Sequence, residues 1–258
     1  MRRASRLTRV ILTAATAAAL ALTLTGTPFA QTTAALPAVA GAPAGQEMRF
    51  ADQIQAMLDG DRAAPPPQNG ILFIGSSIFR QWANVKDHMA PLPAFNRAFG
   101  GSRTWEVLHY MDRIVLPYRP RIIVYYTGSN DVNAGQTAPD IVARTMEFMT
   151  RAHAALPATR IYYVAINRSP DKRDKWDVVD AVNTRIKALA GSAPYMRYLD
   201  LNPVLFKDGE PRMELYRPDG LHFHPPAYDE FAGIIKPALM AAWQEGAGLP
   251  AQTAGRAR

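Results

Sequence analysis

The sequence predicts an α/β domain in which helices cover both faces of an open, mostly parallel sheet. Apolar runs at residues 122–126 and 161–164 are continuous rather than alternating, as in strands that are buried on both faces. Longer amphipathic segments separate the short apolar runs, which is the pattern of repeated βα units. Apolar residue types make up 48% of the 258 residues, enough for one domain with a large core.

The elements follow in alternation along the chain. A short helix is expected at residues 49–58, where apolar residues recur at helical spacing, and the run Ala64-Pro65-Pro66-Pro67 ends it. The strands that we expect are residues 70–74, 94–98, 121–126, 160–165 and 197–200. The helices that we expect between and after them are residues 78–85, 104–116, 139–155, 176–190 and 225–245. Ligands of such sheets bind beyond the carboxyl ends of the strands.

The N-terminus has the pattern of an export signal. Arg2, Arg3, Arg6 and Arg9 precede an almost uncharged run of about 15 residues, which is short for a membrane span. We expect a signal peptide at residues 1–30, with cleavage after Ala30 or Ala40 and a twin-arginine pathway as an alternative. A disordered linker at 31–46, one domain at 47–245 and a disordered tail at 246–258 should follow. A periplasmic or extracellular protein without stable membrane association is therefore expected, and a retained N-terminal anchor is the alternative.

Composition excludes several classes of function. The chain has no cysteine, and so no disulfide, thiolate metal site or cysteine nucleophile. The net charge of +7 falls to +3 without the four N-terminal arginines, and the remaining basic residues are scattered among acids. Nucleic-acid binding needs a clustered basic surface, so no nucleic-acid partner is expected. Residues 168–175 mix both signs of charge and predict a solvated loop.

The first candidate motif is Gly75-Ser76-Ser77, where a strand turns into a helix. A serine at a helix N-terminus lies beside free backbone N–H groups that favour negative charge, which suits a nucleophile whose reaction creates an oxyanion. The alternative is that Ser76 or Ser77 only caps the helix. The motif lacks the second glycine of the G-x-S-x-G elbow, which argues against an α/β-hydrolase.

The second candidate motif is Asp219-Gly220-Leu221-His222, just before the last helix. A carboxylate three residues before an imidazole can accept its N–H and leave the other ring nitrogen free as a base. One alternative is a turn cap beside a surface histidine. The other is a metal pair of His222 and His224, for which no nearby acid or histidine cluster completes a ligand set.

Two further segments end strands at the same edge of the predicted sheet. One holds Asn130, and the other holds Gly101 within a pair of glycines. Either could be an ordinary turn. Each also offers an N–H donor of the kind that stabilises an oxyanion. Together the four segments predict a hydrolase site.

These segments, in this order, resemble the four sequence blocks of the SGNH (GDSL-type) esterase/lipase superfamily. The longer matches around residues 73–82, 96–102 and 219–223 are similar to the branch that contains the platelet-activating-factor acetylhydrolase catalytic subunits. The resemblance covers roughly residues 70–240. Two departures are Ser76, where the family name has aspartate, and Pro225-Pro226-Ala227-Tyr228, which replaces a common glycine-tyrosine.

The resemblance implies a flavodoxin-like, three-layer α/β/α sandwich with a five-stranded, mostly parallel sheet. It implies an ester hydrolase that needs no cofactor or metal, with Ser77 as nucleophile, His222 as base and Asp219 as its orienting acid. The oxyanion hole would consist of the Ser77 N–H, the Gly101 N–H and the Asn130 side chain.

We therefore expect a secreted serine esterase that acts on short-chain carboxylic esters, with O-acetyl groups of small molecules or glycans as the expected substrates. A non-catalytic carbohydrate-binding module on the same fold is the alternative, and a phosphatase or metal hydrolase is a further one. The aromatic side chains near the motifs could line a substrate pocket, although such spacing is more typical of a core. They are Trp82, Trp105, Tyr126 and Phe223.

Overall fold

The computed structural model describes residue 43 and residues 45–245. Five strands form one sheet in the order β2-β1-β3-β4-β5, and every neighbouring pair is parallel. This is the strand order of flavodoxin-like folds, so the predicted fold class is confirmed. The strands are β1 (Ile71–Gly75), β2 (Ala94–Asn96), β3 (Ile122–Tyr126), β4 (Arg160–Val164) and β5 (Met196–Leu199).

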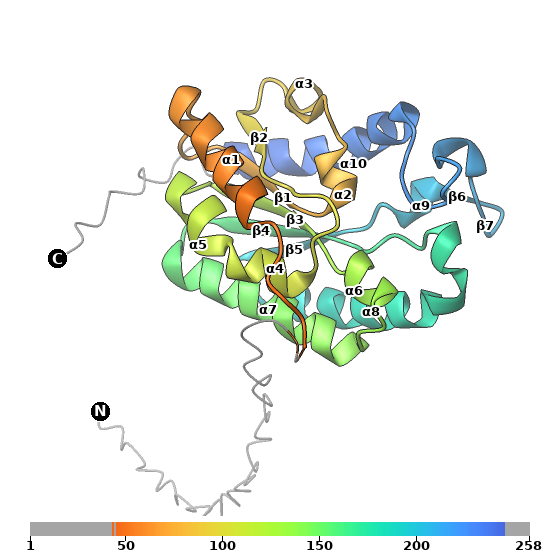
Figure 1. The fold of residues 1–258 in the computed structure, drawn as a ribbon. Coiled ribbons are helices and arrows are strands. Elements are labelled where there is room, and N and C mark those ends of the chain that lie inside the picture. Colours follow the sequence, from red (N-terminus) through yellow and green to blue (C-terminus); the bar gives the residue numbers. More distant parts are fainter. Residues whose placement is uncertain (1–42, 44, 246–258) are drawn as a thin grey trace, which may run out of the picture. The chain divides into compact units, whose positions relative to one another are not determined.

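Helices cover both faces of this sheet and make three layers (Figure 1). One face carries α1 (Ala51–Ala63), α4 (Thr104–His109), α5 (Met111–Ile114), α7 (Ala138–Ala155) and α8 (Trp176–Ser192). The other carries α2 (Ser77–Arg80), α3 (Val85–Met89), α9 (Asn202–Leu205) and α10 (Pro225–Glu245). Successive strand residues point to opposite faces, so Ile123 and Tyr125 enter the first core while Val124 and Tyr126 enter the second.

The expected helices at 78–85 and 104–116 are each broken into shorter pieces. The first becomes α2 and α3, because the chain leaves the helix at Gln81 and turns Trp82 inward against Phe73 and Phe79. The second becomes α4, α5 and a 3₁₀ turn at Leu116–Tyr118. The helix expected at 49–58 instead begins at Ala51 and continues to Ala63, because its exposed residues also favour a helix until the prolines that follow.

Several short elements have no counterpart in the predicted set. They are α6 (Ser129–Asn133), α9, 3₁₀ turns at Pro170–Lys175 and Met213–Leu215, and the hairpin of β6 (Phe206–Lys207) and β7 (Glu210–Pro211). The segment 168–175 is only in part the solvated loop that its charges predict: Arg173 and Asp174 are exposed, but Pro170–Lys175 is a 3₁₀ turn. Lys172 is fully buried and its Nζ lies 3.2 Å from both carboxylate oxygens of Asp171. Burial lowers the pKa of Lys172, although the neighbouring Asp171 carboxylate acts to raise it.

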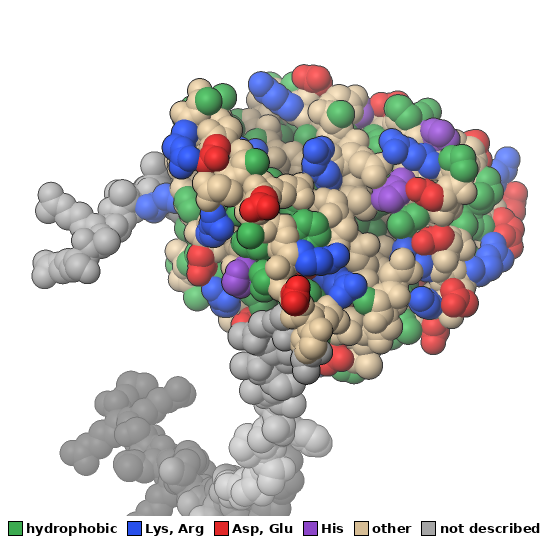
Figure 2. Space-filling model, in the orientation of Figure 1, with side chains coloured by type: hydrophobic (Ala, Val, Ile, Leu, Met, Phe, Trp, Pro, Cys, Tyr) green, Lys and Arg blue, Asp and Glu red, His purple; other side chains and the backbone are tan. Residues whose placement is uncertain are grey.

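The aromatic side chains near the motifs belong to the core. Trp82, Trp105, Tyr126 and Phe223 are each at most 1% exposed, so the core interpretation of these residues is the correct one. On the face shown in Figure 2, basic and acidic side chains are interspersed. Within the described part of the chain, no helix is both long and apolar enough to cross a membrane.

The predicted signal peptide at 1–30, most of the linker and the tail at 246–258 lie outside the described residues. At the end of the predicted linker, Gln46 donates its backbone N–H to Pro43 O and accepts a hydrogen bond from Arg103 through its side chain. The chain is therefore attached to the domain from Gln46 onward.

Gly75 lets the end of β1 approach β3 without a side chain between them. Its φ is +145°, and a Cβ added there would lie 1.8 Å from the carbonyl oxygen of Tyr126. The backbone would have to move to accept any other residue.

Gly75→Ala should therefore lower the free energy of unfolding by more than about 3 kcal/mol, because it combines overpacking with backbone strain. Gly60→Ala is the matched control, since a Cβ on Gly60, inside α1, meets no atom within 4 Å. That control should gain about 0.5–1 kcal/mol from helix propensity. Urea denaturation followed by circular dichroism measures both, and equal stability of Gly75→Ala and the wild type would contradict the packing described here.

Candidate active site

The turn between β1 and α2 presents Ser77 at the carboxyl edge of the sheet. Ser76 donates its N–H to Tyr126 O at 3.1 Å, and Ser77 is the first residue of α2. The side chain of Ser76 makes no capping hydrogen bond, and Ser77 Oγ faces His222 instead. A role as helix cap therefore explains neither serine.

Two side chains from other elements hold α2 in place. Asn96, at the end of β2, donates its side-chain amide to Phe79 O at 2.6 Å. Tyr228, on α10, donates its hydroxyl to Ile78 O at 3.0 Å. Tyr228 belongs to the segment that departs from the family pattern, and its contact shows that this departure keeps the last helix attached to the serine turn.

His222 and its carboxylate partner lie on one loop, residues 217–224, which we call the histidine loop. The loop is closed by a hydrogen bond from Arg217 N to His222 O at 2.7 Å, and Tyr216 pairs with Phe223 across it. Asp219 Oδ1 accepts the backbone N–H groups of Leu221 and His222, each at 2.9 Å. The turn therefore fixes the carboxylate before the imidazole contacts it.

The structure brings Ser77, His222 and Asp219 into one chain of hydrogen bonds. Nε2 of His222 lies 2.9 Å from Ser77 Oγ, although the two residues are 145 positions apart. Nδ1 of His222 lies 2.7 Å from Asp219 Oδ2. A carboxylate can only accept, so Nδ1 carries the proton and the lone pair of Nε2 faces the serine hydroxyl. The side chains of His222 and Asp219 are 21% and 49% exposed, so the site is open to solvent.

Asp219 is held in its charged form. Desolvation acts to raise the pKa of this carboxyl, but the hydrogen bonds from the His222 ring and from the N–H groups of His222 and Leu221 outweigh it. Together with the charge of His222, they lower the pKa of Asp219 to about 2. The carboxylate therefore stays ionised from mildly acidic to alkaline pH.

Gly101 lies on a loop, residues 99–103, which we call the glycine loop. Two hydrogen bonds attach this loop to the carbonyl oxygen of Gly75, from Phe99 N at 2.9 Å and from Ser102 Oγ at 3.1 Å. A Cβ added to Gly100 would lie 3.9 Å from Ser77 Cβ, so the loop runs directly beside the serine. Gly101 itself has φ +79°, a conformation that favours glycine.

Asn130 approaches the glycine loop from the first turn of α6. Its Nδ2 donates to Ser102 O at 2.9 Å, which leaves the second N–H of the same amide for another acceptor. The predicted donors therefore lie on connected segments: Ser77 is two residues after Gly75, Gly75 O accepts hydrogen bonds from the glycine loop, and the glycine loop accepts one from Asn130.

Asp131, next to Asn130, has a structural role that the sequence does not reveal. It is fully buried and accepts the N–H of Thr104 at 3.0 Å and the hydroxyl of Thr104 at 2.5 Å. Burial raises the pKa of Asp131 to about 6, against the lowering effect of the Thr104 hydrogen bonds and of Arg144. Asp131 thereby ties the start of α4 to the start of α6, on which Asn130 lies.

The histidine loop also has a neighbour that the sequence does not reveal. Asp171 donates its backbone N–H to Gly220 O at 3.2 Å, and its carboxylate pairs with the buried Lys172. Pro170 could have indicated the 3₁₀ turn that carries Asp171, because proline is common at the first position of a helix, but it does not indicate the contact with Gly220.

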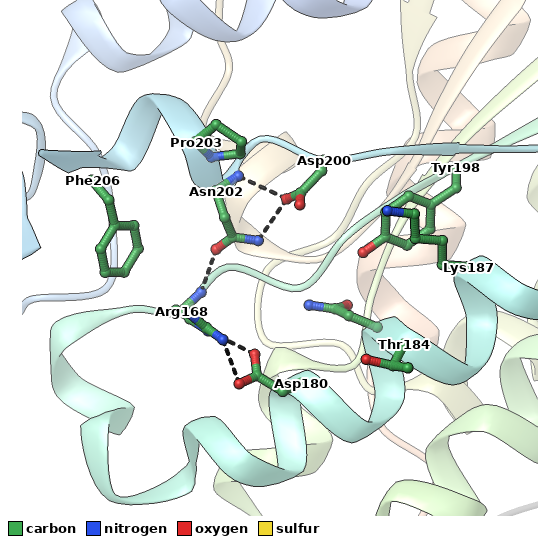
Figure 3. A pocket seen from close by; sticks show the side chains of 10 residues that line it. Arg168, Asp180, Thr184, Lys187, Tyr198, Asp200, Asn202, Pro203 and Phe206 are labelled. Atoms are coloured by element: carbon green, nitrogen blue, oxygen red, sulfur yellow. Dashed lines mark hydrogen bonds and ion pairs between the residues drawn. The ribbon is translucent and has the colours of Figure 1, made fainter. Parts of the chain in front are cut away.

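A separate cleft of about 510 Å³ opens beyond the carboxyl ends of β4 and β5 (Figure 3). Tyr198 and Phe206 are two of its lining residues, and Arg168 forms a two-pronged ion pair with Asp180 at 2.6 and 2.5 Å beside them. None of Ser77, His222 and Asp219 lines this cleft. Across the described residues, no group of three or more histidine, aspartate or glutamate side chains is arranged to hold a metal ion.

Asp131→Asn tests the buried carboxylate. The folded-state pKa of about 6 lies above the ordinary 3.8, so the folded chain binds the proton more tightly than the unfolded chain. The contribution of Asp131 to stability is therefore complete below about pH 4 and is lost as the pH rises through about 6. Relative to Asp131→Asn, the wild type should lose on the order of 2–3 kcal/mol of unfolding free energy between these limits. Urea titrations of both proteins at each pH measure this, and a pH-independent difference would contradict it.

Comparisons with known proteins identify the family and agree with the fold. The model of the GDSL-like lipase/acylhydrolase family matches residues 73–229, whereas no curated protein matches the chain. A GDSL-like lipase of Bacteroides thetaiotaomicron has the same fold, with 18% identity and a TM-score of 0.64 over 73% of this chain and 98% of that one.

Two further solved structures share the fold. A carbohydrate esterase family 3 protein of Talaromyces cellulolyticus is 18% identical, with a TM-score of 0.54 over 68% of this chain and 98% of that one. The catalytic domain of peptidoglycan O-acetyltransferase A of Streptococcus pneumoniae is 19% identical, with a TM-score of 0.54 over 69% and 96%. Because the family model spans more than half of the sequence, this chain belongs to the GDSL-like lipase/acylhydrolase family and is a carboxylic ester hydrolase.

Proposed function

We propose that the protein is an exported serine esterase that hydrolyses short-chain esters through Ser77, His222 and Asp219. The observation that carries the proposal is the hydrogen-bonded chain of these three side chains, at 2.9 and 2.7 Å, beside the glycine loop. A serine hydroxyl is a weak nucleophile until an adjacent base accepts its proton, and this geometry supplies that base.

In the first half of the reaction, Nε2 of His222 accepts the Ser77 hydroxyl proton as Oγ attacks the ester carbonyl carbon. The C=O electron pair moves to oxygen, and the resulting anion is stabilised by the N–H groups of Ser77 and Gly101 and by the Asn130 amide. Asp219, charged at working pH, stabilises the imidazolium and holds its ring. The tetrahedral intermediate collapses when Nε2 returns the proton to the leaving alcohol.

The second half repeats these steps with water. His222 takes a proton from water, the hydroxyl adds to the acyl-Ser77 carbonyl, and the same donors hold the second oxyanion. Collapse releases the acid and returns the proton to Ser77 Oγ. All bonds formed and broken are accounted for by the ester, water and these side chains.

The proposed substrates are short acyl esters, with O-acetyl groups on glycans as the favoured class. The partial exposure of His222 and Asp219 supports an open site, which offers little apolar surface to a long acyl chain. The carbohydrate esterase and the peptidoglycan O-acetyltransferase of the same fold support acetylated glycans. The basic and apolar N-terminal residues support export, with signal cleavage after Ala30 or Ala40, and hence an ester outside the cytoplasm.

Ser77→Ala should lower kcat for p-nitrophenyl acetate by at least about a thousand-fold, because no other hydroxyl contacts Nε2 of His222 in the described structure. Ser76→Ala is the matched control: Ser76 is buried, its hydroxyl has no hydrogen-bond partner, and its loss should leave kcat within about two-fold. An organophosphonate should label the wild type at Ser77 alone. Full activity of Ser77→Ala would refute the assignment, and binding to a polysaccharide without hydrolysis would favour the carbohydrate-binding alternative.

A series of p-nitrophenyl esters from acetate to palmitate tests the acyl-chain preference. We expect kcat/KM to be highest for acetate or butyrate and to fall by at least about ten-fold at octanoate, because an open site offers too few contacts to offset the entropy lost in ordering a long acyl chain. Acetate release from acetylated polysaccharides, measured on the same preparation, tests the glycan. A maximum at palmitate would contradict the short-chain proposal.

A further inference from the structure

The segment before α1, residues 46–50, contacts the glycine loop through Gln46, Arg49 and Phe50. We call it the anchor segment. It precedes residue 73, where the match to the family model begins. Figure 1 shows it passing α4 before it enters α1, so it lies where the helix that follows the glycine loop starts.

Arg49 makes the central contacts of the anchor segment. Its Nη2 donates to the carbonyl oxygen of Gly101 at 3.1 Å. The same guanidinium forms a two-pronged ion pair with Glu106, from Nε at 2.7 Å and from Nη2 at 2.8 Å. The side chain of Glu106 is fully buried, whereas that of Arg49 is 45% exposed.

Glu106 connects this ion pair back to the loop. Its Oε2 also accepts the backbone N–H of Arg103, the last residue of the glycine loop, at 2.9 Å. One carboxylate therefore holds both the end of the loop and the arginine that holds Gly101. Burying the Glu106 carboxylate without a partner would cost free energy, so the ion pair holds the Arg49 guanidinium beside it.

The neighbours of Arg49 fix its own backbone. Tyr110 donates its hydroxyl to Arg49 O at 2.6 Å. The ring of Phe50 packs edge-on against Phe99, with centroids 5.2 Å apart, and Phe50 Cζ lies 3.9 Å from the position of a Cβ on Gly101. The glycine loop is thus held between Gly75 on one side and the anchor segment on the other.

Because it contains two consecutive glycines, the glycine loop depends on contacts from other segments for its conformation. Gly100 and Gly101 have no side chains of their own to restrict φ and ψ, so the direction of the Gly101 N–H depends on outside contacts. Oxyanion stabilisation requires donors that are already oriented before the reaction. The hydrogen bond to Gly101 O fixes the peptide plane on the C-terminal side of Gly101. It thereby limits the rotation of Gly101, whose N–H is the proposed donor.

We propose that Arg49 is a positioning residue of the esterase, which orients the Gly101 N–H for the oxyanion by binding Gly101 O from outside the matched family region. This inference rests on the proposed function. It adds a residue to the site that acts through Gly101 and does not contact the reacting atoms.

The test compares Arg49→Ala with Arg113→Ala on p-nitrophenyl acetate. Arg113 is the matched control, because its Nη2 donates to Gln55 Oε1 at 2.8 Å, between α5 and α1, and not to a residue of the glycine loop. Arg49→Ala should lower kcat by about 10- to 100-fold, with KM changed by less than about three-fold, since the oriented donor acts on the transition state. Arg113→Ala should leave both constants unchanged.

Chemical rescue distinguishes a positioning role of Arg49 from a role in the stability of the fold alone. Millimolar guanidinium chloride should restore part of kcat in Arg49→Ala and leave the wild type unaffected, because the free ion can occupy the space between Glu106 and Gly101. Arg49→Lys keeps a positive charge beside Glu106 but lacks the planar fork. Arg49→Lys should unfold at the same thermal midpoint as the wild type but have a lower kcat.

Two results would overturn the proposal. One is a folded Arg49→Ala with kcat within about two-fold of the wild type. The other is an Arg49→Lys variant with full kcat. If Arg49→Ala does not fold, the double variant Arg49→Ala/Glu106→Gln removes the unpaired buried charge and is measured in its place, with the same expectations for kcat and KM. A wild type without Ser77-dependent hydrolysis would refute the proposed function, whereas active wild type with unaffected Arg49 variants would refute only this inference.

Discussion

The close approach of Gly75 to the backbone of Tyr126 is the constraint on which the site depends. Without a Cβ, the end of β1 lies against β3 and the chain turns directly into α2, which places Ser77 at the sheet edge. The carbonyl oxygen of Gly75 accepts hydrogen bonds from Phe99 and Ser102. One glycine thus sets the position of the serine turn and, through its oxygen, that of the loop beside it.

The sheet could be predicted from the sequence because its signals are local. Parallel strands buried on both faces appear as continuous apolar runs, and all five expected strands lie within two residues of the observed bounds at each end. The histidine loop was predictable for the same reason, since Asp219 and His222 are three residues apart. The distance from His222 to Ser77 is not a local property, because it depends on how α10 packs against the sheet. The shared edge of the predicted sheet and the resemblance to a family indicated it, but no local pattern did.

What the sequence did not reveal is that three charged side chains are buried. Glu106, Asp131 and Lys172 are all fully buried, although their charge predicts exposure. Each is compensated by a partner that no periodicity indicates: Arg49 for Glu106, Thr104 for Asp131, and Asp171 for Lys172. The breaks at Gln81 and Tyr110 were missed for a related reason, because side chains turn into a core whose shape is set by other elements.

The arrangement of His222 and Asp219 on one short loop has a consequence for how the molecule would lose its activity. The acid and the imidazole are paired through contacts inside residues 217–224. The hydrogen bond to Ser77 joins this loop to a distant part of the chain, and Tyr228 on α10 is one of the side chains that hold the helix carrying Ser77. Heating that detaches the C-terminal helix would therefore abolish activity while the strands of the sheet remained paired. The enzyme would lose activity at a lower temperature than that at which the sheet unfolds.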